Sequence, residues 1–219
     1  MIAVTAGAED APKLTPVADP KLILDELQQK MAALTSVYLE FTQERHLKLF
    51  AEPLKSEGVM MIDRPGKIRW ETTAPYRSIL LGDPKSVAQF EFTDGQWKKL
   101  KLGFPQMLRG VMDQMTMMHQ GKFDALAKDF TISVATGAVT AVTLEPKDEN
   151  LRALIAQLEL HLYPDFSGTR ELIMREPGGD ETRIHIKKET RRVNFPAGTF
   201  DQSKPLDVAA IKTAVENAK

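Results

Sequence analysis

An alternation of apolar and polar side chains between residues 37 and 70 is the feature that most limits what this chain can fold into. Such a period-two pattern is typical of half-buried strands. Gln43 and Arg45 interrupt the apolar face, and Arg64-Pro65 ends it, because proline has no amide proton for a strand ladder. The pattern predicts two neighbouring strands with a basic residue at their rim. The apolar positions are Val37, Leu39, Phe41, Leu47 and Leu49, followed by Met60 and Ile62.

Similar alternation, with glycine, proline or aspartate between the segments, continues along most of the chain. It predicts about eleven strands, and the short connections between them favour an antiparallel meander. A sheet of this size usually curls into a barrel or partial barrel, so the expected fold class is mainly β (α+β). The expected strands are at about 36–50, 54–63, 67–73, 77–82, 86–93, 96–102, 131–135, 138–145, 157–163, 170–175 and 181–187, and the helices at about 20–34, 105–121, 122–128 and within 207–219.

A single domain is expected over residues 19–203, because 219 residues can bury a sizeable core without cross-links. Residues 204–219 are expected to form a C-terminal helical tail. In the N-terminal tail, residues 1–18, Ala6-Gly7-Ala8 matches the small-x-small pattern that precedes a signal-peptidase site. This tail is therefore either the remnant of a secretion leader or a disordered native terminus.

Composition and motifs argue against several classes of function. The 29 basic and 30 acidic side chains nearly cancel, so no nucleic-acid partner is expected. There is no cysteine and no apolar run of about 18 residues, which argues against thiolate chemistry and a transmembrane helix. The four histidines are scattered, and no phosphate loop, dinucleotide fingerprint or nucleophile elbow is present. We expect no metal, no cofactor and no enzyme activity, although a carboxylate pair such as Asp63 with Glu71 is the chemistry that an enzyme would use.

Methionine is concentrated in the helix expected after the sixth strand. Five of the ten methionines lie between residues 107 and 118. One interpretation is that this apolar stripe only docks the helix on the sheet. The other is that flexible thioethers form an adaptable lid over an apolar cavity, because a core with one fixed packing generally uses leucine and isoleucine. The stripe consists of Met107, Leu108, Val111, Met112, Met115 and Met118.

The order of several short motifs resembles that of the outer-membrane lipoprotein carrier (LolA) family. The resemblance covers about residues 20–102 most strongly. It rests on the helix before Val37, Phe41-Thr42-Gln43, Gly58, Arg64-Pro65, Trp70, Pro75 and Ile79-Leu80-Leu81, with weaker echoes at Val142-x-Leu144-x-Pro146, Gly179-Asp180 and 194–200.

The resemblance implies a periplasmic carrier with an open, incomplete antiparallel barrel and helices that cover its concave side as a lid. Such carriers take the acyl chains of lipoproteins, or here of related lipids, from an inner-membrane ABC lipoprotein-releasing transporter to an outer-membrane receptor. Arg64 resembles the family arginine that hydrogen-bonds to the lid backbone in the closed state; the alternative is a solvated turn arginine. The implied ligand-binding and lid residues are Arg64, Ile68, Trp70, Phe41, Leu39, Met60 and the six residues of the methionine stripe.

Two departures from the family pattern are typical of a divergent branch, for which a different lipid or acyl-conjugated molecule is an alternative cargo. Ile68 stands where better-known members carry an aromatic residue, and Trp97-Lys98-Lys99-Leu100 replaces a tyrosine-containing segment. The alternative function is a non-catalytic β module that binds a protein partner on its concave face or at an apolar edge. That edge would consist of Leu47, Leu49 and Phe50.

Overall fold

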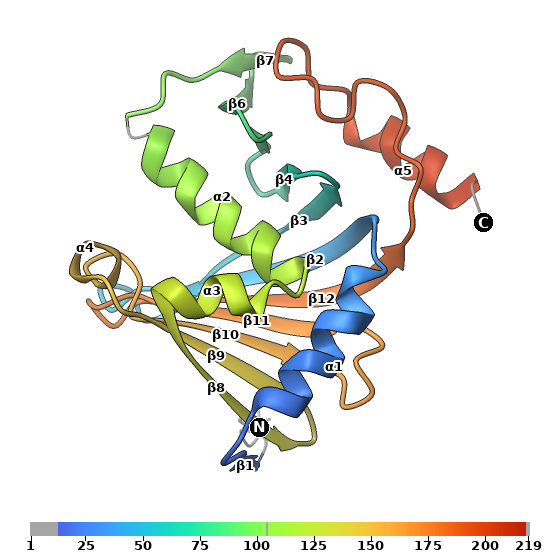
Figure 1. Cartoon of the computed structure of the whole chain (residues 1–219). Coiled ribbons are helices and arrows are strands. Elements are labelled where there is room, and N and C mark those ends of the chain that lie inside the picture. The colour runs from blue at the N-terminus through green and yellow to red at the C-terminus, as the bar shows by residue number, and fades with distance from the viewer. Residues whose placement is uncertain (1–12, 104, 218–219) are drawn as a thin grey trace, which may run out of the picture.

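The structure, a computed structural model, describes residues 13–103 and 105–217; of residues 105–108 and 111 it describes only the backbone. Twelve antiparallel strands form one sheet, in the order β1-β8-β9-β10-β11-β12-β2-β3-β4-β5-β6-β7. The sheet curls but does not close, which leaves the two edge strands apart (Figure 1). The expected fold class, a mainly β chain with an incomplete antiparallel barrel, is confirmed.

The strands and helices follow the sequence periodicity closely. The strands are β1 (Leu14–Pro16), β2 (Ser36–His46), β3 (Leu54–Asp63), β4 (Lys67–Ala74), β5 (Ser78–Gly82), β6 (Val87–Thr93), β7 (Gln96–Lys99), β8 (Phe130–Gly137), β9 (Thr140–Pro146), β10 (Gln157–Leu162), β11 (Thr169–Arg175) and β12 (Glu181–Arg191). The helices are α1 (Lys21–Ala32), α2 (Pro105–His119), α3 (Phe123–Asp129), α4 (Glu149–Arg152) and α5 (Val208–Asn217).

The pairing of β12 with β2 joins two runs of sequential strands into one sheet. Ile186 lies opposite Phe41 and Ile184 opposite Gln43 in this pairing. Side chains of β2 and β3 from the first run therefore share one face with side chains of β10, β11 and β12 from the second. No local pattern in the sequence specifies this contact, since its strands come from distant parts of the chain.

Helices α1, α2 and α3 lie across the concave face of the sheet (Figure 1). Two features let them approach closely. Gly82 of β5 leaves the space that Met112 of α2 fills, since a Cβ there would lie 2.7 Å from the Met112 Cε. Gly121, with a positive φ of 65°, lets the corner between α2 and α3 meet α1, where a Cβ would lie 2.9 Å from Gln28 Cα and from Met31 Cβ. The helices are thus fitted to the sheet and to one another at glycines.

The opposite, convex face is covered by the C-terminal part of the chain. Helix α5 packs on β2 and β3, and lies on the other side of the sheet from α2 (Figure 1). Its buried contacts join the two strands into a separate apolar cluster. This cluster includes Tyr38, Val59, Met61, Ile211 and Val215.

A buried ion pair fixes the segment that leads to α5. Arg69 and Glu71 of β4 are both fully buried, and the Arg69 Nη2 lies 2.5 Å from Glu71 Oε2. The same guanidinium donates to the carbonyl oxygens of Thr199, at 2.8 Å, and Leu206, at 2.6 Å. Burial raises the pKa of Glu71, against the opposing effect of Arg69. Breaking such a pair leaves an uncompensated buried charge, so it holds the C-terminal segment firmly in place.

Three local features differ from the sequence expectations. Leu14–Pro16, which the sequence placed in the N-terminal tail, forms β1 by pairing with β8. Helix α4, a single turn capped by Asp148, was not predicted. The expected strand at 36–50 ends at His46, because the chain then turns with a hydrogen bond from the Phe50 amide to the Leu47 carbonyl. Short pieces of this kind depend on pairing and capping partners elsewhere in the chain, which periodicity does not reveal.

Among the residues that the structure describes, no helix combines the length and apolar composition needed to cross a bilayer.

Candidate functional site

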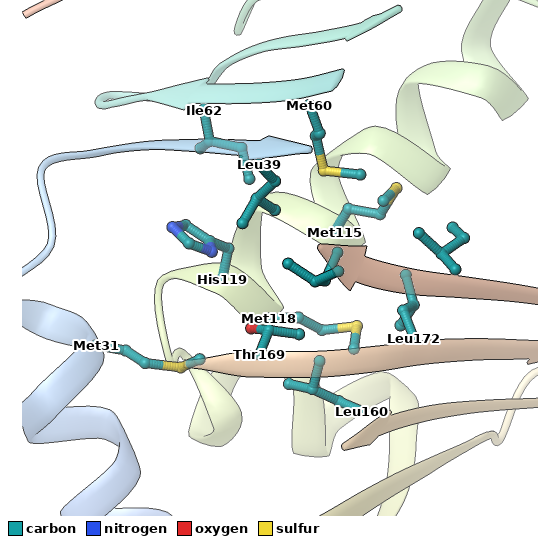
Figure 2. Close-up of a pocket in the computed structure, with 12 residues that line it drawn as sticks. Met31, Leu39, Met60, Ile62, Met115, Met118, His119, Leu160, Thr169 and Leu172 are labelled. Atoms are coloured by element: carbon teal, nitrogen blue, oxygen red, sulfur yellow. The ribbon is translucent and has the colours of Figure 1, made fainter. Parts of the chain in front are cut away.

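An apolar cavity of about 50 Å³ lies between the concave face of the sheet and helices α1 and α2. Figure 2 shows its lining, in which side chains from both strand runs and both helices point toward one another. All but two of the lining side chains are aliphatic or thioether groups. The lining residues are Met31, Leu39, Met60, Ile62, Met115, Met118, His119, Leu160, Thr169, Leu172, Ile184 and Ile186.

The structure brings some of the sequence-predicted site residues into this lining and places others beside it. Leu39, Met60, Met115 and Met118 line the cavity. The backbone of α2 contains Met107, Leu108 and Val111, whose side chains lie outside the described residues. Phe41, Ile68 and Met112 are buried in the adjoining apolar cluster, and Trp70 is half-buried against it with its ring 5.6 Å from that of Phe41.

Sequence reasoning did not single out the remaining lining residues. Met31 lies on the apolar stripe predicted for α1, and the strand residues lie on alternating faces that the sequence already shows. Their shared location follows from the pairing of β12 with β2, which has no local sequence signal. His119 is one of four scattered histidines, and nothing beside it in the sequence suggests a partner. The residues missed are Met31, Ile62, His119, Leu160, Thr169, Leu172, Ile184 and Ile186.

The cavity in this structure is too small for an acyl chain. Pockets for small-molecule ligands occupy roughly 300–1,000 Å³, and a water molecule takes up about 30 Å³ of the liquid. The cavity of about 50 Å³ therefore corresponds to a closed state. Binding a chain of many methylenes requires α1 or α2 to move away from the sheet.

Arg64 connects the rim of the sheet to the end of α1. Its Nη1 donates to the carbonyl oxygen of Ala32 at 2.8 Å, and its Nη2 to that of Met31 at 2.9 Å. These carbonyls belong to the last turn of α1, where a helix has unsatisfied acceptors and a partial negative charge. Burial lowers the pKa of the guanidinium. The sequence interpretation had the methionine helix α2 as the lid, whereas the helix that Arg64 holds is α1.

Helix α2 is held by contacts of its own. Arg109, in its first half, donates to the carbonyl oxygens of Lys85, at 3.2 Å, and Pro84 in the turn between β5 and β6. Met112 and Met118 are buried, and Met115 between them is half-buried over the cavity. The cover thus rests on a few side-chain contacts rather than on a strand ladder, and such contacts are easier to open.

His119, the last residue of α2, is one of two polar side chains in the lining, with Thr169 of β11 as the other. Its Nε2 is buried and has no hydrogen-bond partner within the described part of the chain. Burial lowers its pKa to about 4, and the positive charges of Arg64 and Arg191 act in the same direction. At neutral pH the imidazole is therefore uncharged, with one N–H donor and one acceptor nitrogen.

The carboxylates named in the sequence analysis do not meet in the cavity. Asp63 lies at the surface, 3.7 Å from Lys67, and Glu71 is buried on the convex face with Arg69. Across residues 13–103 and 105–217, no cluster of histidine and carboxylate side chains is arranged to hold a metal ion. The chemistry that the cavity offers is apolar enclosure with two neutral polar side chains, His119 and Thr169.

Several known proteins are similar to this chain over most of its length. A family model described as outer membrane lipoprotein carrier protein LolA matches residues 32–203. The outer-membrane lipoprotein carrier protein of Bordetella avium is 23% identical over 188 residues, covering 86% of this chain and 86% of that protein. The corresponding protein of Dechloromonas aromatica is 24% identical over 184 residues, covering 83% and 84%. A solved LolA superfamily structure from Nitrosomonas europaea covers 85% of this chain and 99% of its own, with a TM-score of 0.46 and 9% identity.

The lowered pKa of His119 predicts a specific pH dependence of stability. Because the pKa is about 4 in the closed fold and about 6.5 when the imidazole is exposed, the open or unfolded chain binds the proton more tightly. This contribution to stability is complete above pH 6.5 and is lost as the pH falls toward 4. Between pH 7.5 and pH 5 we expect wild type to lose about 2 kcal/mol more than His119→Met. Urea unfolding of both proteins at both pH values measures this difference, and parallel losses would contradict it.

Proposed function

The chain belongs to the outer membrane lipoprotein carrier (LolA) family, and from this premise we propose that it carries the acyl chains of lipoproteins, or of related lipids, across the periplasm. Carriers of this family are binding proteins without catalytic activity. The cargo would reach this protein from an inner-membrane ABC lipoprotein-releasing transporter and leave it at an outer-membrane receptor.

The observation that carries the proposal is the closed apolar cavity beneath α1 and α2. Thioethers from three separate elements meet there: Met31 of α1, Met60 of β3, and Met115 and Met118 of α2. Methionine adapts its shape to its surroundings, so a wall of this kind can follow acyl chains of different length and branching. Each methylene that leaves water contributes about 0.8 kcal/mol to binding, which supplies the driving force for a long chain.

A carrier must also open to admit its cargo. The contacts of Arg64 with α1 and of Arg109 with the turn between β5 and β6 are side-chain hydrogen bonds, which can break when the helices move. Cargo binds only to the open form, so it shifts the population from closed to open by its affinity for that form alone. If the helices were held too firmly, the open form would be rare, and the apparent affinity for cargo would fall by the same factor as the open fraction. The few side-chain hydrogen bonds that hold α1 and α2 satisfy this condition better than strand pairing would.

Filling the cavity should abolish cargo binding. Leu172→Trp places a large side chain among the lining residues, and Leu154→Trp places the same side chain at a position 44% exposed outside it. After incubation with a triacylated lipopeptide, native mass spectrometry should show the bound lipid on wild type and on Leu154→Trp, and at least tenfold less on Leu172→Trp.

Circular dichroism would check that Leu172→Trp folds, because overpacking a core commonly costs about 1–3 kcal/mol. No lipid on wild type, or equal loading of both tryptophan variants, would contradict the carrier proposal.

Releasing α1 should speed the exchange of cargo. Arg64→Leu removes two charged hydrogen bonds to the Met31 and Ala32 carbonyls, while the sheet keeps its packing because Arg64 lies at the rim. Hydrogen bonds to charged groups contribute about 1.5–3 kcal/mol, so we expect uptake and release of a fluorescent acyl probe to become at least about tenfold faster. Arg152→Leu is the matched control, since Arg152 also donates to a backbone carbonyl, that of Lys147, but away from the cavity. Unchanged probe kinetics in Arg64→Leu would show that Arg64 does not act as a latch.

A second candidate function, binding of a protein partner at an apolar edge, is favoured by the loop between β2 and β3. Leu49 is 93% exposed, Phe50 57% and Leu54 51%. Large apolar side chains that gather in a loop and at the start of the next strand, as Leu54 does in β3, are typical of contact surfaces. Leu47, the other residue of the predicted edge, is half-buried.

The two candidates separate in a pull-down from periplasmic extract. The double variant Leu49→Ser, Phe50→Ser should lose a protein partner if the edge binds one, whereas Leu22→Ser, a change at another exposed leucine on α1, should keep it. Recovery of the same proteins by wild type and both variants would exclude the edge as a binding surface.

A further inference from the structure

Among the described residues, the buried Nε2 of His119 has no hydrogen-bond partner, which suggests that it binds a ligand. A buried polar atom without a hydrogen bond costs roughly 1–3 kcal/mol, and such atoms in native proteins usually have a functional reason. His119 Nε2 is buried in this way, and its side chain lines a cavity that is otherwise almost entirely apolar. Methionine or leucine at this position would continue the lining without the penalty. The presence of an imidazole therefore indicates that something polar comes to it.

The position of His119 limits the chemical class of ligand that it can bind. In Figure 2 the imidazole lies at the end of the cavity where Met31 and Ile62 are found. Arg64 holds the Met31 carbonyl at the same end, and its Nε is also buried without a hydrogen-bond partner among the described residues. Polar atoms thus gather at the α1 end of the cavity. The rest of the lining, around Met115 and Leu172, is hydrocarbon and thioether.

A linear acyl chain likewise has one polar end and one apolar part, because its only polar group is the carbonyl at its head. The carbonyl oxygen is a neutral acceptor, and a neutral imidazole can donate to it without placing a charge in apolar surroundings. Burial, together with the positive charges of Arg64 and Arg191, lowers the pKa of His119 and keeps the imidazole in this uncharged form. A carboxylate head group would instead be drawn to the Arg64 guanidinium itself.

Resting on the carrier role proposed above, we infer that His119 Nε2 donates a hydrogen bond to the ester or amide carbonyl oxygen at the head of the bound acyl chain. The chain then enters tail first from the α1 end. Its tail runs past Met115 toward Leu172 and Ile184, and its head stays next to the contact between Arg64 and α1. His119 is a specificity residue: it distinguishes acylated cargo from alkyl chains that have no carbonyl.

Two lipids of equal length provide the test. Palmitoyl glycerol carries an ester carbonyl, and hexadecyl glycerol is an ether with a methylene group in place of that carbonyl. Competition against a bound fluorescent acyl probe, below the micelle concentration of each lipid, gives their relative affinities. We expect wild type to prefer the ester by about tenfold, the size of a well-formed hydrogen bond in an apolar site.

Three variants establish that the preference comes from His119. His119→Met should reduce the ester-to-ether ratio to about one, and His119→Gln, which keeps an N–H donor, should restore part of it. His185→Met is the matched control, because His185 lies on the other face of the sheet near Glu171 and should leave the preference as in wild type.

Thermal unfolding distinguishes a histidine that binds cargo from one that only stabilises the fold. Since His119→Met removes an unpartnered polar atom from an apolar wall, its melting temperature at pH 7 should equal or exceed that of wild type. A lower melting temperature together with an unchanged ester preference would mean that the imidazole serves packing, and would overturn the inference.

The outcomes also separate this inference from the carrier proposal. If wild type binds both lipids equally well, the carrier role stands and the role of His119 is wrong. If wild type binds neither lipid, the carrier role itself fails.

Discussion

The apolar concave face of an unclosed sheet is the constraint on which the rest of this structure depends. A closed barrel of twelve strands would cover its own interior, whereas this sheet leaves β1 and β7 apart and its concave side open. If the apolar side chains on that side were exposed to water, the fold would lose the hydrophobic free energy of burying a whole sheet face. Helices α1, α2 and α3 cover it, and the cavity is the space that they leave at the centre.

The two faces of the sheet are covered in physically different ways. On the convex face, Arg69 and Glu71 form a fully buried ion pair, and Arg69 also binds the carbonyls of the C-terminal segment. Removing either charge would take away the nearest ion-pair partner of the other. On the concave face, α1 is held at its end by Arg64 and α2 by Arg109 and the packing of Met112 at Gly82. The first arrangement fixes a frame, and the second lets a cover open from it. This difference gives the protein one firm side and one adaptable side.

The sequence predicted most of the elements, and the misses have identifiable causes. Period-two alternation located eleven of the twelve strands, while β1 exists only because β8 offers it an edge. Leu47 and Leu49 fit the alternating pattern of β2 but lie beyond its end, because β12, which begins at Glu181, pairs no farther than His46. The interruption of the apolar face at Gln43 and Arg45 falls toward that same end of β2, away from the cavity residue Leu39. Sequence periodicity indicates which face of the sheet a residue is on. It does not indicate where the neighbouring strand ends, and so it cannot give the end of the pairing.

The sequence by itself determined most of the secondary structure, the apolar faces and the rim position of Arg64, because these depend on residue order within a few positions. Only the tertiary structure decided that Arg64 binds the end of α1 and that the Nε2 of His119 lies buried at the same end of the cavity. Both facts depend on the curl of the sheet and on β12 pairing with β2, which bring distant parts of the chain together. A histidine acquires its pKa and its unpartnered nitrogen from those distant neighbours, and no local pattern contains them.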